Sequence, residues 1–274
     1  MKRLSLIVVI ICFVQLTSAQ TLIAPETASN LKELGLKGPV KVLTEYAYEM
    51  NKDTSGKRTK AIFQYDRNGN LLVEILYSPN GMITSKAVYQ YKKKDIIIIN
   101  QFNFKGKQVN KLILKYDNQK RLIEAVQYAL PSTSVVYRTV FKYNNNGNEI
   151  ERDHYDFKGH KDWPETTFYN EKNQKTEVDN VSDFNSKILY AYDTSGQLTK
   201  EQVVNKTDLS VCDETTYVKY DKYGNWLIRT AVETPRGMAA TTAYLMREFN
   251  ANIKITEPDF EIQLITEREI KYFN

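Results

Sequence analysis

Cysteine is scarce in this 274-residue chain, which contains only Cys12 and Cys212. Cys12 lies in the apolar run of residues 4–16, directly after two basic residues near the N-terminus. This order is typical of a secretory signal peptide, so we expect residues 1–19 to be cleaved and Cys212 to remain alone. A single cysteine excludes an internal disulfide, and we expect Cys212 to be a buried, unreactive side chain. We therefore expect a protein of the periplasm, the cell surface or the secreted fraction.

Neither sign of charge is in large excess, and no long apolar run follows the signal peptide. The chain has 38 basic and 33 acidic residues, an excess of +5 that falls to +3 without Lys2 and Arg3. So small an excess does not favour nucleic acid as a partner. The most apolar later run, Ile96–Ile99, is too short to cross a bilayer and suits a strand. We expect no stable membrane span in the mature chain.

Residues that carry out chemistry are also few. The only two histidines, His154 and His160, lie in the stretch ERDHYDFKGHKDW, where we expect solvated hairpin side chains. We expect Glu151, Asp153 and Asp156 to occupy a solvated strand face and not to form a pair of catalytic acids. The chain has no HExxH, GxSxG, P-loop or dinucleotide-binding motif. The sequence therefore predicts a protein that is not an enzyme and has no metal or cofactor.

Tyrosine, in contrast, is abundant, with 19 copies. Seven of them recur at steps of 26, 25, 27, 26, 23 and 28 residues, several in similar words such as YDRNGNL, YDTSGQL and YDKYGNW. These anchor tyrosines are Tyr65, Tyr91, Tyr116, Tyr143, Tyr169, Tyr192 and Tyr220. A fixed period of this size indicates an array of similar supersecondary units. We expect the tyrosines to form rows across the sheet, with their hydroxyls at a wet edge.

Each unit has the pattern of a strand hairpin. In ILYAYD the residues Ile188, Tyr190 and Tyr192 alternate with other residues and therefore share one face of a strand. Gly and Asn follow the anchors and suit tight turns, and we expect the Asp after Tyr to cap its own turn. A second turn near the middle of each period, such as Lys105–Gly106, gives two strands per period. The predicted fold is all-β, a long antiparallel meander of fourteen to sixteen strands in a twisted open or partly closed sheet.

The tyrosine words carry a resemblance to a known family. YDRNGNL, YDTSGQL and YDKYGNW resemble the YD repeats of RHS-type proteins, which are secreted or surface β-repeat proteins. The order of signal peptide, LKGPVKVLTEYAYE, hairpin repeats and closing EREIKYF is also similar to small uncharacterised exported proteins of Bacteroidetes-type bacteria. The resemblance implies a β-repeat architecture over most of the chain.

The repeat also suggests where the chain divides. Residues 1–19 form the signal peptide, and residues 20–39 are expected to form an N-terminal cap. Residues 40–230 hold the hairpin array, and residues 231–274 form an atypical C-terminal cap with a closing strand. The segment at 231–263 is longer than other connections, which favours either a cap or a site-forming loop.

The function that these features favour is that of an exported, non-enzymatic β-repeat protein. It would present an extended surface to a protein partner or a cell-envelope polymer. One alternative is a glycan-binding module that uses surface aromatic residues, and another is a hydrolase whose active site is walled by the C-terminal insertion. The oligomeric state stays open. The candidate binding residues are Tyr65, Tyr91, Tyr116, Tyr143, Trp163, Tyr192, Tyr220 and Trp226.

Overall fold

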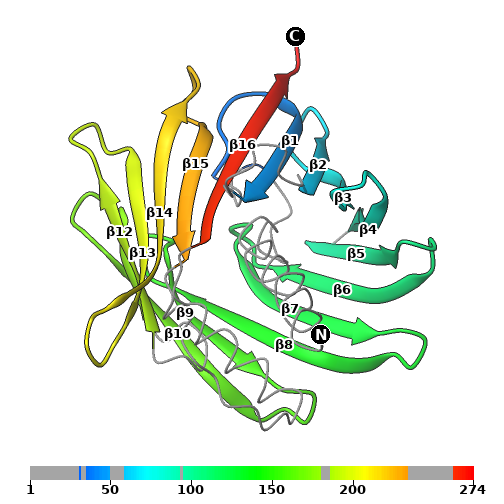
Figure 1. The fold of residues 1–274 in the computed structure, drawn as a ribbon. Coiled ribbons are helices and arrows are strands. Elements are labelled where there is room, and N and C mark those ends of the chain that lie inside the picture. The colour runs from blue at the N-terminus through cyan, green and yellow to red at the C-terminus, as the bar shows by residue number, and fades with distance from the viewer. Residues whose placement is uncertain (1–30, 32–34, 50–58, 93–94, 180–185, 234–261) are drawn as a thin grey trace, which may run out of the picture.

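The computed structural model describes residues 31, 35–49, 59–92, 95–179, 186–233 and 262–274, which form sixteen strands (Figure 1). The first eight are β1 Val40–Glu49, β2 Thr59–Tyr65, β3 Leu71–Tyr77, β4 Ile83–Lys92, β5 Ile96–Asn103, β6 Gln108–Tyr116, β7 Leu122–Ala129 and β8 Ser134–Tyr143. The second eight are β9 Glu149–Tyr155, β10 Lys161–Tyr169, β11 Lys175–Asp179, β12 Ser186–Tyr192, β13 Leu198–Asn205, β14 Val211–Tyr220, β15 Trp226–Glu233 and β16 Ile262–Tyr272. The predicted signal peptide and most of the predicted C-terminal insertion lie outside the described residues.

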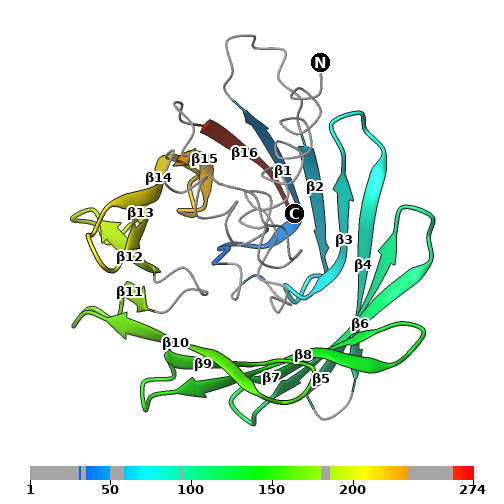
Figure 2. The same ribbon diagram turned by 60° about the horizontal axis from the view of Figure 1, so that its bottom comes forward.

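The strands form one closed antiparallel barrel. Each strand pairs with its neighbours in sequence, and β1 pairs with β16 over the register Val40–Tyr272 to Glu49–Leu264. Figure 2 shows the ring of strands from another side, with the segment before β1 running inside it. The all-β prediction is confirmed, but the prediction of an open or partly closed sheet is wrong. Closure pairs both ends of the meander, so within the described strands no sheet edge is left free. Among the described residues, no helix is long and apolar enough to cross a membrane.

The turns after five of the anchor tyrosines share one geometry. In the first copy Asp66 Oδ1 accepts hydrogen bonds from the backbone N–H groups of Asn68 at 2.8 Å and Asn70 at 2.9 Å. The same two bonds form in the turns that begin at Asp117, Asn144, Asp193 and Asp221. The third residue after the Tyr-Asx pair has positive φ, as at Gly69 with φ 81°. This confirms that the Asx residue caps its own turn.

The anchor tyrosines are joined to one another through the backbone. Five of their hydroxyls donate a hydrogen bond to a backbone carbonyl in the preceding repeat. The acceptor is the first residue of the strand that follows that repeat's tyrosine turn. The donor and acceptor pairs are Tyr91 and Leu71 (2.8 Å), Tyr143 and Leu122 (2.7 Å), Tyr169 and Glu149 (2.9 Å), Tyr192 and Lys175 (2.8 Å), and Tyr220 and Leu198. We expected these hydroxyls at a wet edge, but each of the five is bonded to backbone. The period of the sequence is therefore the spacing at which one hairpin fastens to the next.

The apolar core lies inside the barrel and is concentrated in β1 to β8. Its members come from alternate positions of these strands and from Leu36, which precedes β1 in the segment inside the ring. Fully buried examples are Leu43, Phe63, Leu71, Ile99, Leu112 and Leu114. Because side chains alternate along a strand, the residues between these face outward.

The outward face carries charged residues that pair across strands. Glu124 on β7 lies between Lys115 on β6 and Arg138 on β8, 2.6 Å from Arg138. On β9, Asp153 contacts Lys142 at 3.1 Å and Lys161 at 2.6 Å. The predicted solvated acidic face around Glu151 and Asp153 is thus an outer-wall ion-pair network, in which the Asp153 side chain itself is 4% exposed.

Candidate functional site

The inner wall of β9 to β16 is polar, in contrast to the apolar inner wall of β1 to β8. Arg152 on β9 contacts Glu149 at 2.8 Å and Glu165 at 3.4 Å. His154 lies on the same face, 3.4 Å from Glu165 and 3.2 Å from the hydroxyl of Thr139. Burial raises the pKa of Glu165, but its contacts with His154 and Arg152 outweigh that effect and lower it overall. The wall can therefore hold charge inside the barrel because each of these charges has a partner.

A cavity of 370 Å³ lies against this polar wall, and we call it the lumen pocket. It lies between the segment before β1 and the inner faces of β12 to β16. The side chains that define it include Lys37, Tyr192, Glu201, Tyr217, Trp226 and Arg268. Aromatic rings, a carboxylate and two cations thus converge on one partly open cavity, which is the composition of a site for a polar ligand.

Trp226 and Arg268 form the centre of the pocket wall. The Arg268 guanidinium lies 3.4 Å from the centre of the indole ring, and the Arg229 guanidinium lies 4.7 Å from it. Arg268 is itself held by Glu45 on β1, whose Oε1 accepts hydrogen bonds from Nε and Nη2 at 2.6 Å. Burial and the nearby charge of Arg229 lower the pKa of Arg268, against the opposing effect of Glu45. The pocket wall is therefore built across the β1–β16 closure.

Tyrosines continue the wall on the other side of Glu201. The hydroxyl of Tyr217 donates to Glu201 at 2.9 Å, and Tyr190 is the direct cross-strand neighbour of Glu201. Lys175 places its ammonium 5.7 Å from the centre of the Tyr190 ring. Burial is the main cause of the lowered pKa of Lys175. Lys175 forms no ion pair with any other described residue, so its positive charge is available to a ligand with negative charge.

The segment before β1 closes one side of the pocket and is fixed to the last tyrosine turn. Asn225 accepts a hydrogen bond from the Lys37 backbone N–H at 2.7 Å and donates one to the Lys37 carbonyl at 2.9 Å. It also contacts Tyr272 on β16, which donates to Asp221. The stretch YDKYGNW therefore forms a turn and, through its buried Asn225, also links the segment before β1 to β16.

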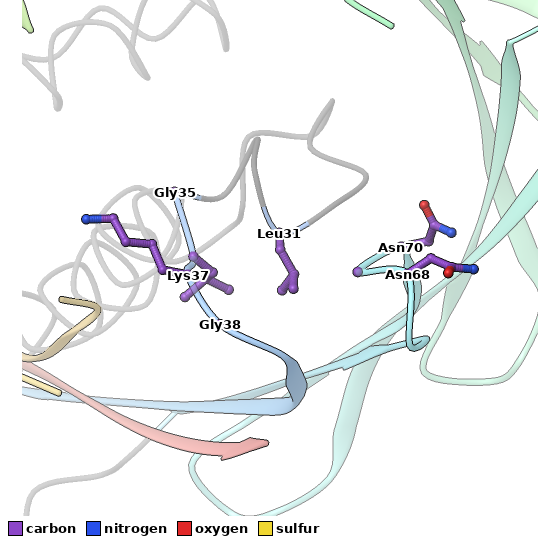
Figure 3. A pocket seen from close by; sticks show the side chains of 8 residues that line it. Leu31, Gly35, Lys37, Gly38, Asn68 and Asn70 are labelled. Atoms are coloured by element: carbon purple, nitrogen blue, oxygen red, sulfur yellow. The ribbon is translucent and has the colours of Figure 1, made fainter. Parts of the chain in front are cut away.

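The same segment borders a second, more open cavity of 530 Å³ beside the first tyrosine turn (Figure 3). Leu31 points toward the turn that carries Asn68 and Asn70. A Cβ on Gly69 would lie 3.1 Å from Cδ1 of Leu31, so the turn and the segment are in close contact. This cavity is lined largely by backbone and leucine, and its described lining holds one charged side chain, Lys37.

The eight candidate binding residues are placed in three ways. Tyr192, Tyr220 and Trp226 line the lumen pocket. Tyr65 is 3% exposed, and Tyr116 and Tyr143 pack against the apolar core. Tyr91 is 38% exposed, whereas the side chain of Trp163 lies outside the described part of β10. That these residues bind a ligand stays a prediction.

Sequence reasoning missed the charged part of the pocket, namely Lys37, Lys175, Glu201, Arg229 and Arg268. None of these residues is an anchor or belongs to a motif, so their convergence comes from closure of the barrel alone. His160 is exposed beside Asp156, as expected of a hairpin residue, but His154 faces the polar interior. The described residues contain no group of three His, Cys, Asp or Glu side chains that could hold a metal ion. Cys212 is buried, as predicted.

Comparison with known proteins shows similarity at the level of fold. No family model matches the chain, so the YD/RHS family that the tyrosine words resemble is not shown. No curated protein matches it either. A porin-like protein from Bacteroides uniformis has a similar structure, with a TM-score of 0.56 and 10% identity over 85% of this chain and 98% of that chain.

Weaker matches include a protein of unknown function from Bacteroides fragilis, with a TM-score of 0.28 and 13% identity over 42% of this chain and 86% of that chain. A TcdB2-TccC3 structure gives a TM-score of 0.30 and 12% identity over 65% of this chain and 12% of that chain. TM-scores this low do not establish a shared fold with either structure. The first match supports the large barrel fold alone.

Proposed function

We propose that this chain is a non-enzymatic protein of the bacterial envelope that binds a polar ligand, a glycan, inside its barrel. The observation that carries the proposal is the lumen pocket, where Tyr192, Tyr217 and Trp226 meet the polar side chains of Glu201 and Arg268. Sites for small polar molecules combine an apolar or aromatic wall with a few fixed hydrogen-bonding groups. The binding surface is thus proposed on the inside of the barrel, and not along an extended outer face.

The envelope location is supported by two observations. The sequence begins with a segment typical of a secretory signal peptide, and the similar structure from Bacteroides uniformis is of a porin-like protein. We further propose that the outer wall meets water, because it carries pairs such as Arg138–Glu124 and Lys161–Asp153. An Arg or Lys on the lipid face of a barrel costs roughly 2–4 kcal/mol near the bilayer centre.

Binding without catalysis is supported by the state of the acidic groups. Glu201 accepts the hydroxyl of Tyr217, Glu45 is paired with Arg268, and Glu165 is held between Arg152 and His154. Carboxylates fixed in this way stabilise the wall and are poorly suited to exchange protons with a substrate. The hydrolase alternative relied on the C-terminal insertion, of which residues 234–261 lie outside the described residues.

The proposal is tested by measuring saccharide binding to the mature chain with isothermal titration calorimetry. The probes are maltotriose, chitotriose and tri-galacturonate. Gln197 lines the pocket, and Gln197→Trp should fill it and weaken binding at least tenfold. Gln64 is exposed on the outer wall of β2, so Gln64→Trp is the matched control and should bind as the parent does. Absence of binding by the parent, or unchanged binding by Gln197→Trp, contradicts the proposal.

A further inference from the structure

We infer that the lumen pocket selects ligands that carry an oxyanion, such as an acidic sugar, over neutral ones. This inference rests on the proposed function and names the ligand class of the same site. It is carried by a surplus of unpaired hydrogen-bond donors around the pocket, whereas the nearby carboxylates already have partners.

The first unpaired donor is Lys37. Its side chain lines the pocket, and its ammonium lies close to the last tyrosine turn, 3.4 Å from where a Cβ on Gly224 would be. The Lys37 backbone is fixed by Asn225 on both its N–H and its carbonyl. Within the part of the chain that the structure describes, the ammonium has no ion-pair or hydrogen-bond partner. The backbone thus holds a free cation at the mouth of the pocket.

The second donor is Arg268, which lies deeper. Its side chain is 10% exposed, and Nε and Nη2 both donate to one oxygen of Glu45. Nη1 has no partner among the described residues, and the guanidinium borders the pocket beside Trp226. A buried guanidinium with a free N–H edge is well suited to receive a carboxylate, sulfate or phosphate oxygen.

The third donor is Lys175, behind Tyr190. Its ammonium lies 5.7 Å from the centre of the Tyr190 ring, and Tyr190 is the cross-strand neighbour of Glu201 of the pocket wall. The carboxylates that interact with its charge are Glu149, Glu201 and Glu165, of which Glu149 and Glu165 are paired with Arg152 and Glu201 accepts the Tyr217 hydroxyl. Lys175 therefore adds positive charge to the wall without an ion pair to any described carboxylate.

The acceptors near the pocket are committed to structure. Asp193 and Asp221 each receive backbone N–H groups of their own turns, and Asp221 is also bonded by Tyr272. Glu201 receives the Tyr217 hydroxyl. The indole of Trp226 is contacted by two guanidinium groups, which makes it a support for the cations more than a free stacking face. A ligand that supplies negatively charged oxygens completes this arrangement.

The test compares one sugar with and without its charge. Calorimetry on the mature chain uses tri-galacturonate, its tri-methyl ester and maltotriose, at low and high NaCl. Inorganic sulfate and phosphate are added as competitors to distinguish a carboxylate-specific site from a general oxyanion site. We expect the acid to bind roughly tenfold or more tightly than the ester, since hydrogen bonds to charged groups are stronger than hydrogen bonds between neutral groups. We also expect the advantage to shrink at high salt.

Substitutions test which residues produce the preference for the acidic sugar. Lys175→Gln and Lys37→Gln should each remove most of the preference for the acid while leaving binding of the ester unchanged. Lys115→Gln, a change on the outer wall, is the control and should alter neither. Equal binding of acid and ester by the parent overturns the inference but leaves the proposed function standing. If none of the three sugars binds, the proposed function fails as well.

Discussion

The hydroxyl of Tyr143 donates a 2.7 Å hydrogen bond to the carbonyl of Leu122, which begins the strand after the preceding tyrosine turn. Four more anchor tyrosines, Tyr91, Tyr169, Tyr192 and Tyr220, make the equivalent bond, so these five bonds each fasten one hairpin to the hairpin before it. The first anchor, Tyr65, follows no earlier repeat. Its buried hydroxyl has no hydrogen-bond partner among the described residues.

This difference predicts that replacing Tyr by Phe changes stability differently at the two positions. Tyr143→Phe removes a hydrogen bond and leaves the Leu122 carbonyl without that donor, so the free energy of unfolding should fall by roughly 0.5–1.5 kcal/mol. Tyr65→Phe removes a hydroxyl that is buried without a partner, and stability should be unchanged or increased. Urea unfolding of the two variants measures both. Equal losses would contradict the role assigned to the tyrosine bonds.

The turn geometry predicts a second pair of effects. Gly147 has φ 80°, with no heavy atom close to where its Cβ would be, so Gly147→Ala tests backbone strain alone. An L-residue in this region costs roughly 1–2 kcal/mol, and we expect a loss of that size in urea unfolding. Asn145→Ala in the same turn, at an exposed position, is the control and should change stability little. A loss no larger than the control's would show that the turn does not need positive φ.

The barrel closure contains a buried ion pair between Glu45 and Arg268. Replacing only one of the two residues should lower the free energy of unfolding strongly. Arg268→Met leaves the Glu45 carboxylate buried without a partner, and we expect a loss of about 3–5 kcal/mol. Adding Glu45→Leu to this variant removes the stranded charge and should restore most of the stability. The double-mutant cycle is measured by urea unfolding. Additive losses in the double variant would show that the two residues do not act as a pair.

The pH dependence of stability should include a contribution from Asp213. Burial raises the pKa of its carboxyl from 3.8 to about 6, so the folded state binds the proton more tightly than the unfolded state does. Stability from this group is full below about pH 4 and is lost as the pH rises through 6, a change of about 3 kcal/mol. Asp213→Asn should therefore match the parent at pH 4 and exceed it at pH 8.

Asp221→Asn is the contrasting variant. Although burial alone raises the pKa of Asp221, its hydrogen bonds with Tyr272 and Asn225 lower it overall. Its carboxylate thus stabilises the fold at neutral pH, and that contribution is lost as the pH falls through the folded pKa. Asp221→Asn should destabilise the protein at pH 8 and much less at acidic pH. If both variants followed the same pH trend, these assignments would be wrong.

Local features of the fold could be predicted from the sequence, whereas its closure could not. The repeat predicted a hairpin array that begins at residue 40, where β1 begins, and the turn words predicted their own Asx caps. These signals are local, since the residues that interact lie a few positions apart. The pairing of β1 with β16 depends on how twist accumulates over the whole sheet, which no single stretch encodes.

The same reason explains what was missed in the candidate site. Tyr192, Tyr220 and Trp226 belong to the repeat and could be selected from it. Glu45 and Arg268 are 223 positions apart and meet only because the barrel closes. The polar inner wall is therefore a consequence of closure, and a flat sheet with the same sequence would not assemble it.

Closure of the barrel between β1 and β16 is the feature on which the pocket depends. A disulfide cross-link between these two strands tests it most directly. Ala47 and Thr266 are directly paired on the inner face, and neighbouring strands bring such positions within disulfide range. In a Cys212→Ser background, Ala47→Cys with Thr266→Cys should give a nearly complete intramolecular disulfide in the monomer. Ala47→Cys with Ala125→Cys, on the distant strand β7, should give none. If the first pair stays reduced, or links only between molecules, the barrel is not closed as described.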